Sequence, residues 1–189
     1  LGWLFGTRAR ETEDIKGLYI FGEVGRGKTM LMDLFFEASP VLRKRRVHFH
    51  EFMRSVHREL DDLKGTENPL DEVAERLASR YRLICFDEFH VADIADAMIL
   101  HRVLSRLFEL NVGFVMTSNY PPDGLYPDGL HRDRILPAID LLKQQLDVLA
   151  VDGGIDYRKR AMLRIDAYLT PEGAASDTII QEAYKRINK

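Results

Sequence analysis

The eight residues GEVGRGKT at 22–29 constrain the fold of this chain more than any other feature of its sequence. They match the pattern G-x-x-x-x-G-K-[ST] at every fixed position. A short apolar run at 18–21 comes directly before them, and an apolar segment at 29–36 follows. Glycines let such a loop turn its backbone N–H groups inward, and the following helix adds the positive end of its dipole. The motif therefore predicts a phosphate-binding loop between a strand and a helix.

We expect this loop and the residue that follows it, Met30, to form the nucleotide site. The candidate binding residues are Gly22, Glu23, Val24, Gly25, Arg26, Gly27, Lys28, Thr29 and Met30. Lys28 should reach the β- and γ-phosphates, and the hydroxyl of Thr29 should bind Mg²⁺. The alternative is a glycine turn without a ligand, which the flanking strand and helix disfavour.

A second motif, LICFDEF at 83–89, ends an apolar run with two carboxylates. Its four apolar residues indicate a buried strand. Asp87, at the end of that strand, is expected to hold Mg²⁺ through water, and Glu88 to orient and deprotonate an attacking water. Alone, the run could be a buried strand followed by a solvated acidic turn. Together with the loop it predicts hydrolysis by water rather than phosphoryl transfer to a small acceptor.

Asn119 follows a further apolar run at 112–116. In a parallel sheet the carboxyl ends of neighbouring strands meet at one edge, so Asn119 would lie beside Asp87. Its amide could then hold the attacking water against the γ-phosphate. The alternative is a turn asparagine that leads into the Pro-Pro pair at 121–122.

Two arginines stand in the segment GLHRDRILPAIDLL at 129–142, where a helix is expected to begin. Neither has an obvious carboxylate partner at helical spacing. An ATPase whose sites are shared between subunits needs an arginine that neutralises transition-state charge at the neighbour's γ-phosphate. Arg132 is the first candidate for this catalytic role and Arg134 the second. The alternative is that both are solvated.

Apolar segments of two kinds alternate along the chain. Strands are predicted at 18–21, 47–52, 83–86, 112–116 and 147–151. Helices are predicted at 29–36, from after 52 to about 63, and at 70–81, 93–110, 130–145 and 176–187. The first helix is expected to carry an apolar face, made of Met30, Leu31, Leu34 and Phe35.

Short apolar strands that alternate with helices predict an α/β fold, a three-layer P-loop domain with a parallel sheet. The extra strand between the loop and Asp87 is the layout of P-loop ATPases that use a catalytic glutamate, and it predicts the strand order 5-1-4-3-2. We expect residues 1–16 to be a lead-in segment, 17–152 the ATPase core, and 153–189 the start of a C-terminal extension. Because the sequence opens without Met, it is expected to be a fragment.

Composition excludes few classes of function. The 189 residues suit one domain, and the formal net charge of −3 gives no overall field that would attract nucleic acid or a membrane. The basic run at 43–46 is interpreted as solvated. Cys85 is the single cysteine, so no disulfide framework exists, and it is expected to be a small buried hydrophobe. No apolar run is long enough to span a bilayer.

Three histidines stand near the second predicted strand. His48 and His50 would alternate on one strand face, with His57 nearby. Zinc needs more convergent ligands than these provide. One of them could instead contact Glu88.

Beyond these motifs, the chain resembles a known family over residues 17 to 168. The segments that carry the resemblance are FGEVGRGKTMLMDLFF, VHFHEFM, CFDEFHVADIADAMIL, TSNYPP, LYPDGLHRDRILPAIDLL and GIDYRKR. In this order they are similar to the ZapE family of bacterial cell-division ATPases and its mitochondrial AFG-type relatives, within the AAA+ class. The blocks containing HEFM and DEFHVADIADAMIL separate this family from other P-loop proteins.

The resemblance implies ATP and Mg²⁺ as ligands, with Lys28, Thr29, Asp87 and Glu88 as the matching positions. It also implies action on a protein partner. In bacteria that partner is an FtsZ-like division protein, and in mitochondria the work is inner-membrane protein quality control. A homo-oligomer in the ATP state and peripheral membrane association fit the same picture, with no nucleic acid expected. We expect the bacterial cytoplasm as location, with mitochondria as the alternative.

This sequence departs from the family in extent. Family members begin earlier and continue further, and the helical lid that carries a second sensor arginine would lie largely beyond residue 189. Arg158 is the nearby candidate for that arginine. Two rival functions stay open: a nucleic-acid-linked ATPase of the replication-initiator or helicase-loader kind, and a scaffold that binds ATP without appreciable turnover.

Overall fold

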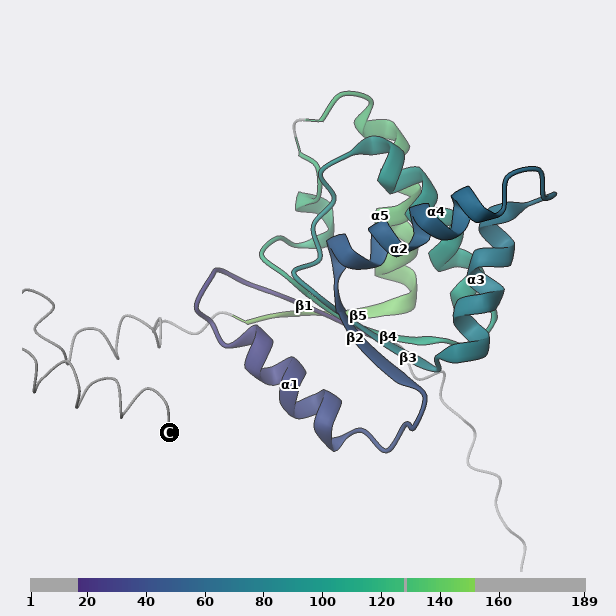
Figure 1. Cartoon of the computed structure of the whole chain (residues 1–189). Coiled ribbons are helices and arrows are strands. Elements are labelled where there is room, and N and C mark those ends of the chain that lie inside the picture. The colour runs from purple at the N-terminus through teal and green to yellow at the C-terminus, as the bar shows by residue number, and fades with distance from the viewer. Residues whose placement is uncertain (1–16, 128, 152–189) are drawn as a thin grey trace, which may run out of the picture.

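The computed structural model describes residues 17–127 and 129–151, which form one parallel sheet with helices on both faces (Figure 1). The strands are β1 (Gly17–Phe21), β2 (Lys44–His48), β3 (Leu83–Asp87), β4 (Gly113–Ser118) and β5 (Leu146–Ala150). The helices are α1 (Lys28–Ala38), α2 (Phe49–Asp62), α3 (Pro69–Arg80), α4 (Ile94–Glu109) and α5 (Leu136–Gln145), with short 3₁₀ turns η1 (Pro122–Gly124) and η2 (Arg132–Arg134).

Every strand pair in the sheet is parallel, and the order is β2-β3-β4-β1-β5. This is the predicted order 5-1-4-3-2 seen from the other edge. The predicted α/β P-loop fold of the AAA+ type is therefore confirmed. Leu18 pairs with Val115 of β4 and Asp147 of β5, so β1 lies inside the sheet with the phosphate-binding loop at its carboxyl end.

The handedness of the crossovers explains which helix covers which face. The connection from β1 to β2 crosses the sheet in one direction, and all later connections cross in the other. Because such crossovers are right-handed, the first helix must lie on one face and the later helices on the opposite face. Figure 1 shows this arrangement, with α1 alone below the sheet and α2 to α5 above it.

The larger part of the core lies between the sheet and α2 to α5. Phe86 of β3 is at its centre, and its ring packs against the rings of Phe49, Phe52, Phe89 and Phe114 at centroid distances of 4.6 to 6.2 Å. A smaller cluster lies under α1. It contains Ile20, Met32, Leu83, Cys85 and Val115.

The predicted apolar face of α1 is not the side of the helix that packs on the sheet. Met32 and Phe36, four residues apart, pack into the cluster under α1. The four residues of the predicted face are between 40% and 61% exposed: Met30, Leu31, Leu34 and Phe35. Because α1 is apolar on more than one side, helical periodicity could not identify the side that meets the sheet.

The bounds predicted for the second strand, 47–52, are also wrong. The strand is β2, which ends at His48, and α2 begins at Phe49. The buried residues of α2 are spaced by three or four positions, the helical period. They are Phe49, Phe52, Met53 and Val56. The basic run thought to be solvated forms most of β2, since a strand at the edge of a sheet lets long charged side chains reach water or polar partners.

The helix predicted at 130–145 begins only at Leu136, with Pro137 in its first turn. Arg132 and Arg134 lie in η2, before the helix. The helices predicted at 29–36, 70–81 and 93–110 agree with α1, α3 and α4 to within one or two residues at each end, whereas α2 begins about four residues earlier than predicted. The lead-in at 1–16, the extension at 153–189, Arg158 and the helix at 176–187 lie outside the described residues. None of the helices in the described ranges combines the length and apolar character that a membrane span needs.

Candidate nucleotide-binding site

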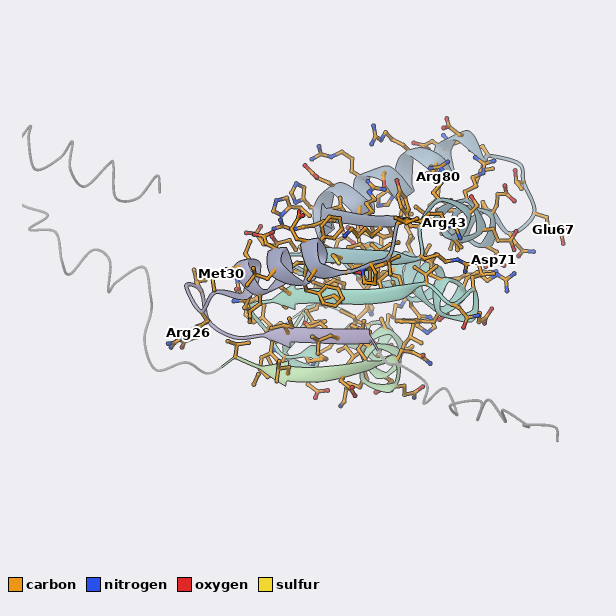
Figure 2. All side chains as sticks on the ribbon, turned by 90° about the horizontal axis from the view of Figure 1, so that it is seen from below. Arg26, Met30, Arg43, Glu67, Asp71 and Arg80 are labelled. Atoms are coloured by element: carbon orange, nitrogen blue, oxygen red, sulfur yellow. The ribbon has the colours of Figure 1, made fainter. Side chains whose placement is uncertain are left out.

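A cavity of about 470 Å³ opens at the carboxyl ends of β1, β3 and β4. It is lined by Val24, Gly25, Arg26, Gly27, Lys28, Thr29, Met30, Asp33, Asp87, Glu88, Thr117, Ser118 and Asn119. Open parallel sheets bind ligands at this edge. Figure 2 shows Arg26 and Met30 at the end of the sheet toward which the strands point, and Arg43, Asp71 and Arg80 at the opposite end. The cavity thus brings together residues from the loop, the acidic motif and the end of β4.

The loop has the conformation that its glycines permit. Gly25 and Gly27 have φ angles of 84° and 80°, in the left-handed region that glycine adopts without strain. Gly27 is followed directly by α1, whose first turn has no side-chain cap. The uncapped N–H groups at this end, together with the helix dipole, favour a phosphate.

Gly22 is needed for a different reason. A Cβ atom on this residue would lie 2.6 Å from the carbonyl oxygen of Val151. The Val151 N–H donates to the Phe21 carbonyl at 2.7 Å, so the end of β5 runs tightly against the start of the loop. The first glycine of the motif therefore allows β1 and β5 to pair up to the edge of the cavity.

Lys28 is buried, and its ammonium group lies inside the loop. Its Nζ donates to the carbonyl oxygens of Gly22 at 2.7 Å and Glu23 at 2.8 Å. Arg26 forms an ion pair of 2.7 Å with the Glu23 carboxylate. Lys28 and Arg26 supply the cationic side of the cavity, where a polyphosphate would need them.

Asp87 is buried, and its two carboxylate oxygens have different partners. Oδ1 accepts hydrogen bonds from the Thr117 hydroxyl at 2.7 Å and the Glu88 N–H at 3.2 Å, and the Thr29 hydroxyl lies 3.4 Å away. Oδ2 accepts from the Arg46 guanidinium at 2.8 Å. Burial alone would raise the pKa of Asp87, but the Thr117 hydrogen bond and the contact and charge of Arg46 outweigh it. The pKa therefore lies below its usual value, and Asp87 is a carboxylate at neutral pH.

This donor set fits a magnesium ion. Mg²⁺ takes oxygen ligands, commonly one or two from the protein beside waters and phosphate oxygens. Thr29 and Asp87 provide a hydroxyl and a carboxylate at one side of the cavity, 3.4 Å apart. These two residues would hold the ion, which supplies positive charge beside a bound polyphosphate.

Glu88 has a φ of 54°, which is uncommon for a residue other than glycine. Its N–H is held by Asp87 Oδ1 and by the Thr117 hydroxyl at 3.3 Å. These bonds keep the backbone in a conformation that leaves the carboxylate exposed at the cavity wall. The imidazole of His48 lies near it, with Nδ1 3.8 Å from Glu88 Oε2.

The histidines differ from their predicted arrangement. His50 lies in α2, not on a strand face with His48, although the two rings stack at a centroid distance of 5.8 Å. His57 pairs with Asp96 at 2.7 Å. Across the described ranges, no group of three or more His, Cys, Asp or Glu side chains is placed to hold a metal ion.

Asn119 follows β4 directly and lines the cavity as an exposed residue. The residue before it is fixed, because the Ser118 hydroxyl donates to the Phe89 carbonyl at 2.8 Å and accepts from the Tyr120 N–H at 3.1 Å. Asn119 lines the same cavity as the two carboxylates of the acidic motif, and its role toward water stays a prediction.

The two candidate arginines are not among the residues that line the cavity. The guanidinium of Arg132 donates to the backbone carbonyls of Asp123 at 2.7 Å and Leu125 at 3.3 Å. Arg134 is exposed, with Nη1 3.9 Å from the sulfur of Met98. Arg132 therefore has backbone partners within the chain, which a search for carboxylates at helical spacing could not reveal.

Sequence reasoning missed three residues at this site. Thr117 stands one position after the predicted end of its strand at 116, so its hydroxyl could have been expected at the edge. Asp33 lies one helical turn after Thr29 and lines the cavity. Arg46 had no usable signal, because its place in a basic run suggested a solvated side chain.

Comparisons with known proteins agree with these features. A family model described as AFG1-like ATPase matches residues 1–189. The cell division protein ZapE of Escherichia coli K12 is 48% identical over 172 residues, which cover 90% of this chain and 46% of that protein. Lactation elevated protein 1 homolog B of Danio rerio is 46% identical over 158 residues, covering 78% of this chain and 31% of that protein.

Among solved structures, domain III of the replication initiation protein DnaA from Thermotoga maritima is similar, with a TM-score of 0.56 and 20% identity. The match covers 82% of this chain and 64% of that one. At this identity the likeness supports the fold alone. The chain spans less than half the length of each of the two curated relatives.

Proposed function

This chain belongs to the AFG1-like ATPase family, and from that premise we propose that it binds ATP with Mg²⁺ in the cavity at the carboxyl edge of the sheet and hydrolyses it. The observation that carries the proposal is the meeting of four residues in one cavity. They are Lys28 and Thr29 of the loop with Asp87 and Glu88 of β3 and its end. A phosphate-binding loop alone would support binding, and the exposed carboxylate beside it supports hydrolysis.

Each residue would have a distinct role. Lys28 would bind the β- and γ-phosphates, and Thr29 and Asp87 would hold Mg²⁺, which lowers the charge of the phosphates. Glu88 would accept a proton from the attacking water, and Asn119 would orient that water. The reaction would be in-line attack on the γ-phosphorus, with the bond to the bridging β–γ oxygen breaking and ADP leaving.

We infer that the site is completed by a second copy of the chain. Arg132 would supply positive charge to the neighbour's γ-phosphate, and Arg134 is the second candidate. The contacts of Arg132 with two backbone carbonyls hold its guanidinium at η2, so it would act from a fixed position. Assembly would then depend on ATP, as in other shared-site ATPases.

The energy of ATP hydrolysis would be used to remodel or tether a protein partner. The name of the E. coli relative is cell division protein, and this supports an FtsZ-like division protein as the partner and the bacterial cytoplasm as the location. Protein quality control at a mitochondrial membrane is the alternative, and with it peripheral membrane association. We expect no nucleic-acid partner, because the formal net charge of −3 gives no overall field that would attract one.

The test measures ATP hydrolysis per subunit against protein concentration, together with binding of a fluorescent ATP analogue. We expect Glu88→Gln to bind the analogue like wild type and to lose hydrolysis by at least about a hundredfold. Glu51→Gln, which changes an exposed carboxylate of α2 outside the cavity, should behave like wild type in both assays.

Hydrolysis equal in wild type and Glu88→Gln at every concentration would refute the enzymatic role and leave a nucleotide-gated scaffold. A per-subunit rate that does not rise with concentration would refute the shared site. Stimulation by DNA that disappears at high salt would favour a nucleic-acid-linked ATPase.

A further inference from the structure

We propose that Arg46 is a built-in counter-ion for the acidic wall of the nucleotide cavity: it pairs with Asp33 and Asp87, offsets part of their negative charge, and so lets the site accept a polyphosphate before Mg²⁺ enters. This inference rests on the proposed function. It assigns a positioning role to a residue that lies outside the loop and the acidic motif.

The geometry comes from three separate segments of the chain. Arg46 is in the edge strand β2, paired in register with Cys85 of β3. One arm of its guanidinium donates to Asp87 Oδ2 at 2.8 Å, and the other forms an ion pair with Asp33 of α1. One planar cation therefore joins β2, β3 and α1 behind the wall of the cavity.

Arg46 does not itself line the cavity, whereas both of its carboxylate partners do. Its position therefore suits a residue that acts through Asp33 and Asp87 rather than one that contacts phosphate. Asp87 Oδ1 is directed to Thr29, Thr117 and the Glu88 N–H, and only Oδ2 meets the arginine. The cation can thus hold the carboxylate without using the oxygen that faces Thr29.

Charge explains why such a partner is needed. Lys28 and Arg26 bring two positive charges to the cavity wall, and Asp33, Asp87 and Glu88 bring three negative ones. A triphosphate approaching without metal would meet net repulsion. Arg46 offsets the two more buried carboxylates, and because it is only partly exposed its charge is less screened than a surface charge.

The same contacts predict how Mg²⁺ changes the contribution of Arg46 to nucleotide binding. When Asp87 gains Mg²⁺ as a second cation, the repulsion that Arg46 offsets is smaller. Loss of Arg46 should therefore weaken nucleotide binding strongly in the absence of the metal and weakly in its presence. A purely structural ion pair would instead weaken both equally, through loss of folded protein.

The experiment measures the Kd of a fluorescent ATP analogue, once in excess EDTA and once in saturating Mg²⁺. For Arg46→Gln we expect the Kd to rise about tenfold in EDTA and less than about threefold in Mg²⁺. The matched control is Arg45→Gln, which removes the same charge from the next residue of β2. The guanidinium of Arg45 lies over the ring of Tyr81, 5.5 Å from its centroid, and both Kd values should stay at wild type.

A second measurement needs no nucleotide. With Arg46 replaced by glutamine, two carboxylates lose their cation, and Mg²⁺ alone should raise the Tm of Arg46→Gln but not that of wild type. Asp33→Asn keeps Arg46 in place and removes one acidic charge, so its Kd in EDTA should fall below that of wild type. This variant tests the inference even if Arg46→Gln does not fold.

The inference is overturned, while the proposed function stands, if the ratio of the Kd in EDTA to the Kd in Mg²⁺ is the same in Arg46→Gln as in wild type. It is also overturned if the Kd of Asp33→Asn in EDTA is not lower than that of wild type. A wild-type protein that binds the analogue in neither condition overturns the proposed function, and this inference with it.

Discussion

The Thr117 hydroxyl donates a 2.7 Å hydrogen bond to Asp87 Oδ1, and both side chains are buried. The same hydroxyl oxygen accepts the N–H of Glu88 at 3.3 Å. One side chain of β4 therefore positions both acidic residues at the end of β3. It holds the carboxylate of Asp87, which is expected to bind the metal, and the backbone of Glu88, which is expected to activate water. The nearly isosteric pair threonine and valine allows this bond to be tested directly.

Thr117→Val should destabilise the protein and impair hydrolysis more than binding. Removing one partner of a buried bond to a charged group costs roughly 1–3 kcal/mol, so the free energy of unfolding in urea should fall by about that amount. The hydrolysis rate should fall more than the analogue Kd rises, since Glu88 loses its support. Thr117→Ser keeps the hydroxyl and should recover most of both. Wild-type hydrolysis in Thr117→Val would contradict the positioning role.

Lys28→Ala should weaken nucleotide binding strongly, with little effect on the fold outside the loop. The ammonium group is the buried cation that bridges the Gly22 and Glu23 carbonyls, and a charge-assisted phosphate contact in a partly enclosed site should account for at least about tenfold in Kd. Binding of the fluorescent analogue measures this. Lys64→Ala removes an exposed lysine that pairs with Asp61, and it should bind normally.

Mixing two inactive variants should restore hydrolysis if the site is shared between subunits. A Lys28→Ala subunit still has Arg132, and an Arg132→Ala subunit still has Lys28. A mixed assembly therefore contains interfaces with one of each, and its rate should exceed the sum of the separate rates. The same experiment with Arg134→Ala in place of Arg132→Ala distinguishes the two candidates. If neither mixture recovers activity although both variants assemble, the arginine assignment is wrong.

Removing the Arg132 side chain should also lower the stability of the chain that carries the substitution. Its two hydrogen bonds to the Asp123 and Leu125 carbonyls connect η2 to the preceding loop. We expect Arg132→Ala to lower the free energy of unfolding by about 1–2 kcal/mol. Arg134→Ala should change it by less than about 0.5 kcal/mol, because Arg134 is exposed. Urea unfolding at equal protein concentration separates the two variants.

Cys85 should be unreactive while the protein is folded. Burial raises the pKa of its thiol to about 11, although Arg46 and Lys44 act in the opposite direction. At pH 8 the folded state therefore contains almost no thiolate, the reactive form. Labelling with a thiol reagent should be slow in buffer and complete in denaturant, where the pKa returns to its ordinary value. Fast labelling in buffer would show that the cluster under α1 opens readily.

Local features of the sequence were enough to predict the loop, the acidic motif and the parallel sheet with its strand order. The loop could be recognised because glycine and lysine act within eight consecutive residues. The strand order could be predicted because an extra strand between Thr29 and Asp87 is the layout of P-loop ATPases that use a catalytic glutamate. Helix α4 was predicted nearly at its true ends, and in the structure the Asp93 carboxylate caps it by accepting a hydrogen bond from the Ala95 N–H.

The start of α2 could not be predicted in the same way, because Val47 and Phe49 alternate like a strand while Phe49 and Phe52 follow the helical period. Both patterns fit so short a run. The contacts of the β2 edge strand decide between them, and they form only when Lys44 to His48 pair with β3.

The sequence by itself determined which residues form the phosphate-binding loop and which strand ends in two carboxylates, because each motif consists of residues close together in the chain. It also indicated the strand order, because an extra strand between the two motifs is the layout of P-loop ATPases that use a catalytic glutamate. Only the tertiary structure decided that α1 packs through Met32 and Phe36, that Thr117 holds Asp87, and that Arg46 joins Asp33 to Asp87. Each of those contacts depends on the register between segments that are far apart in sequence, and residue spacing along the chain carries no direct record of that register.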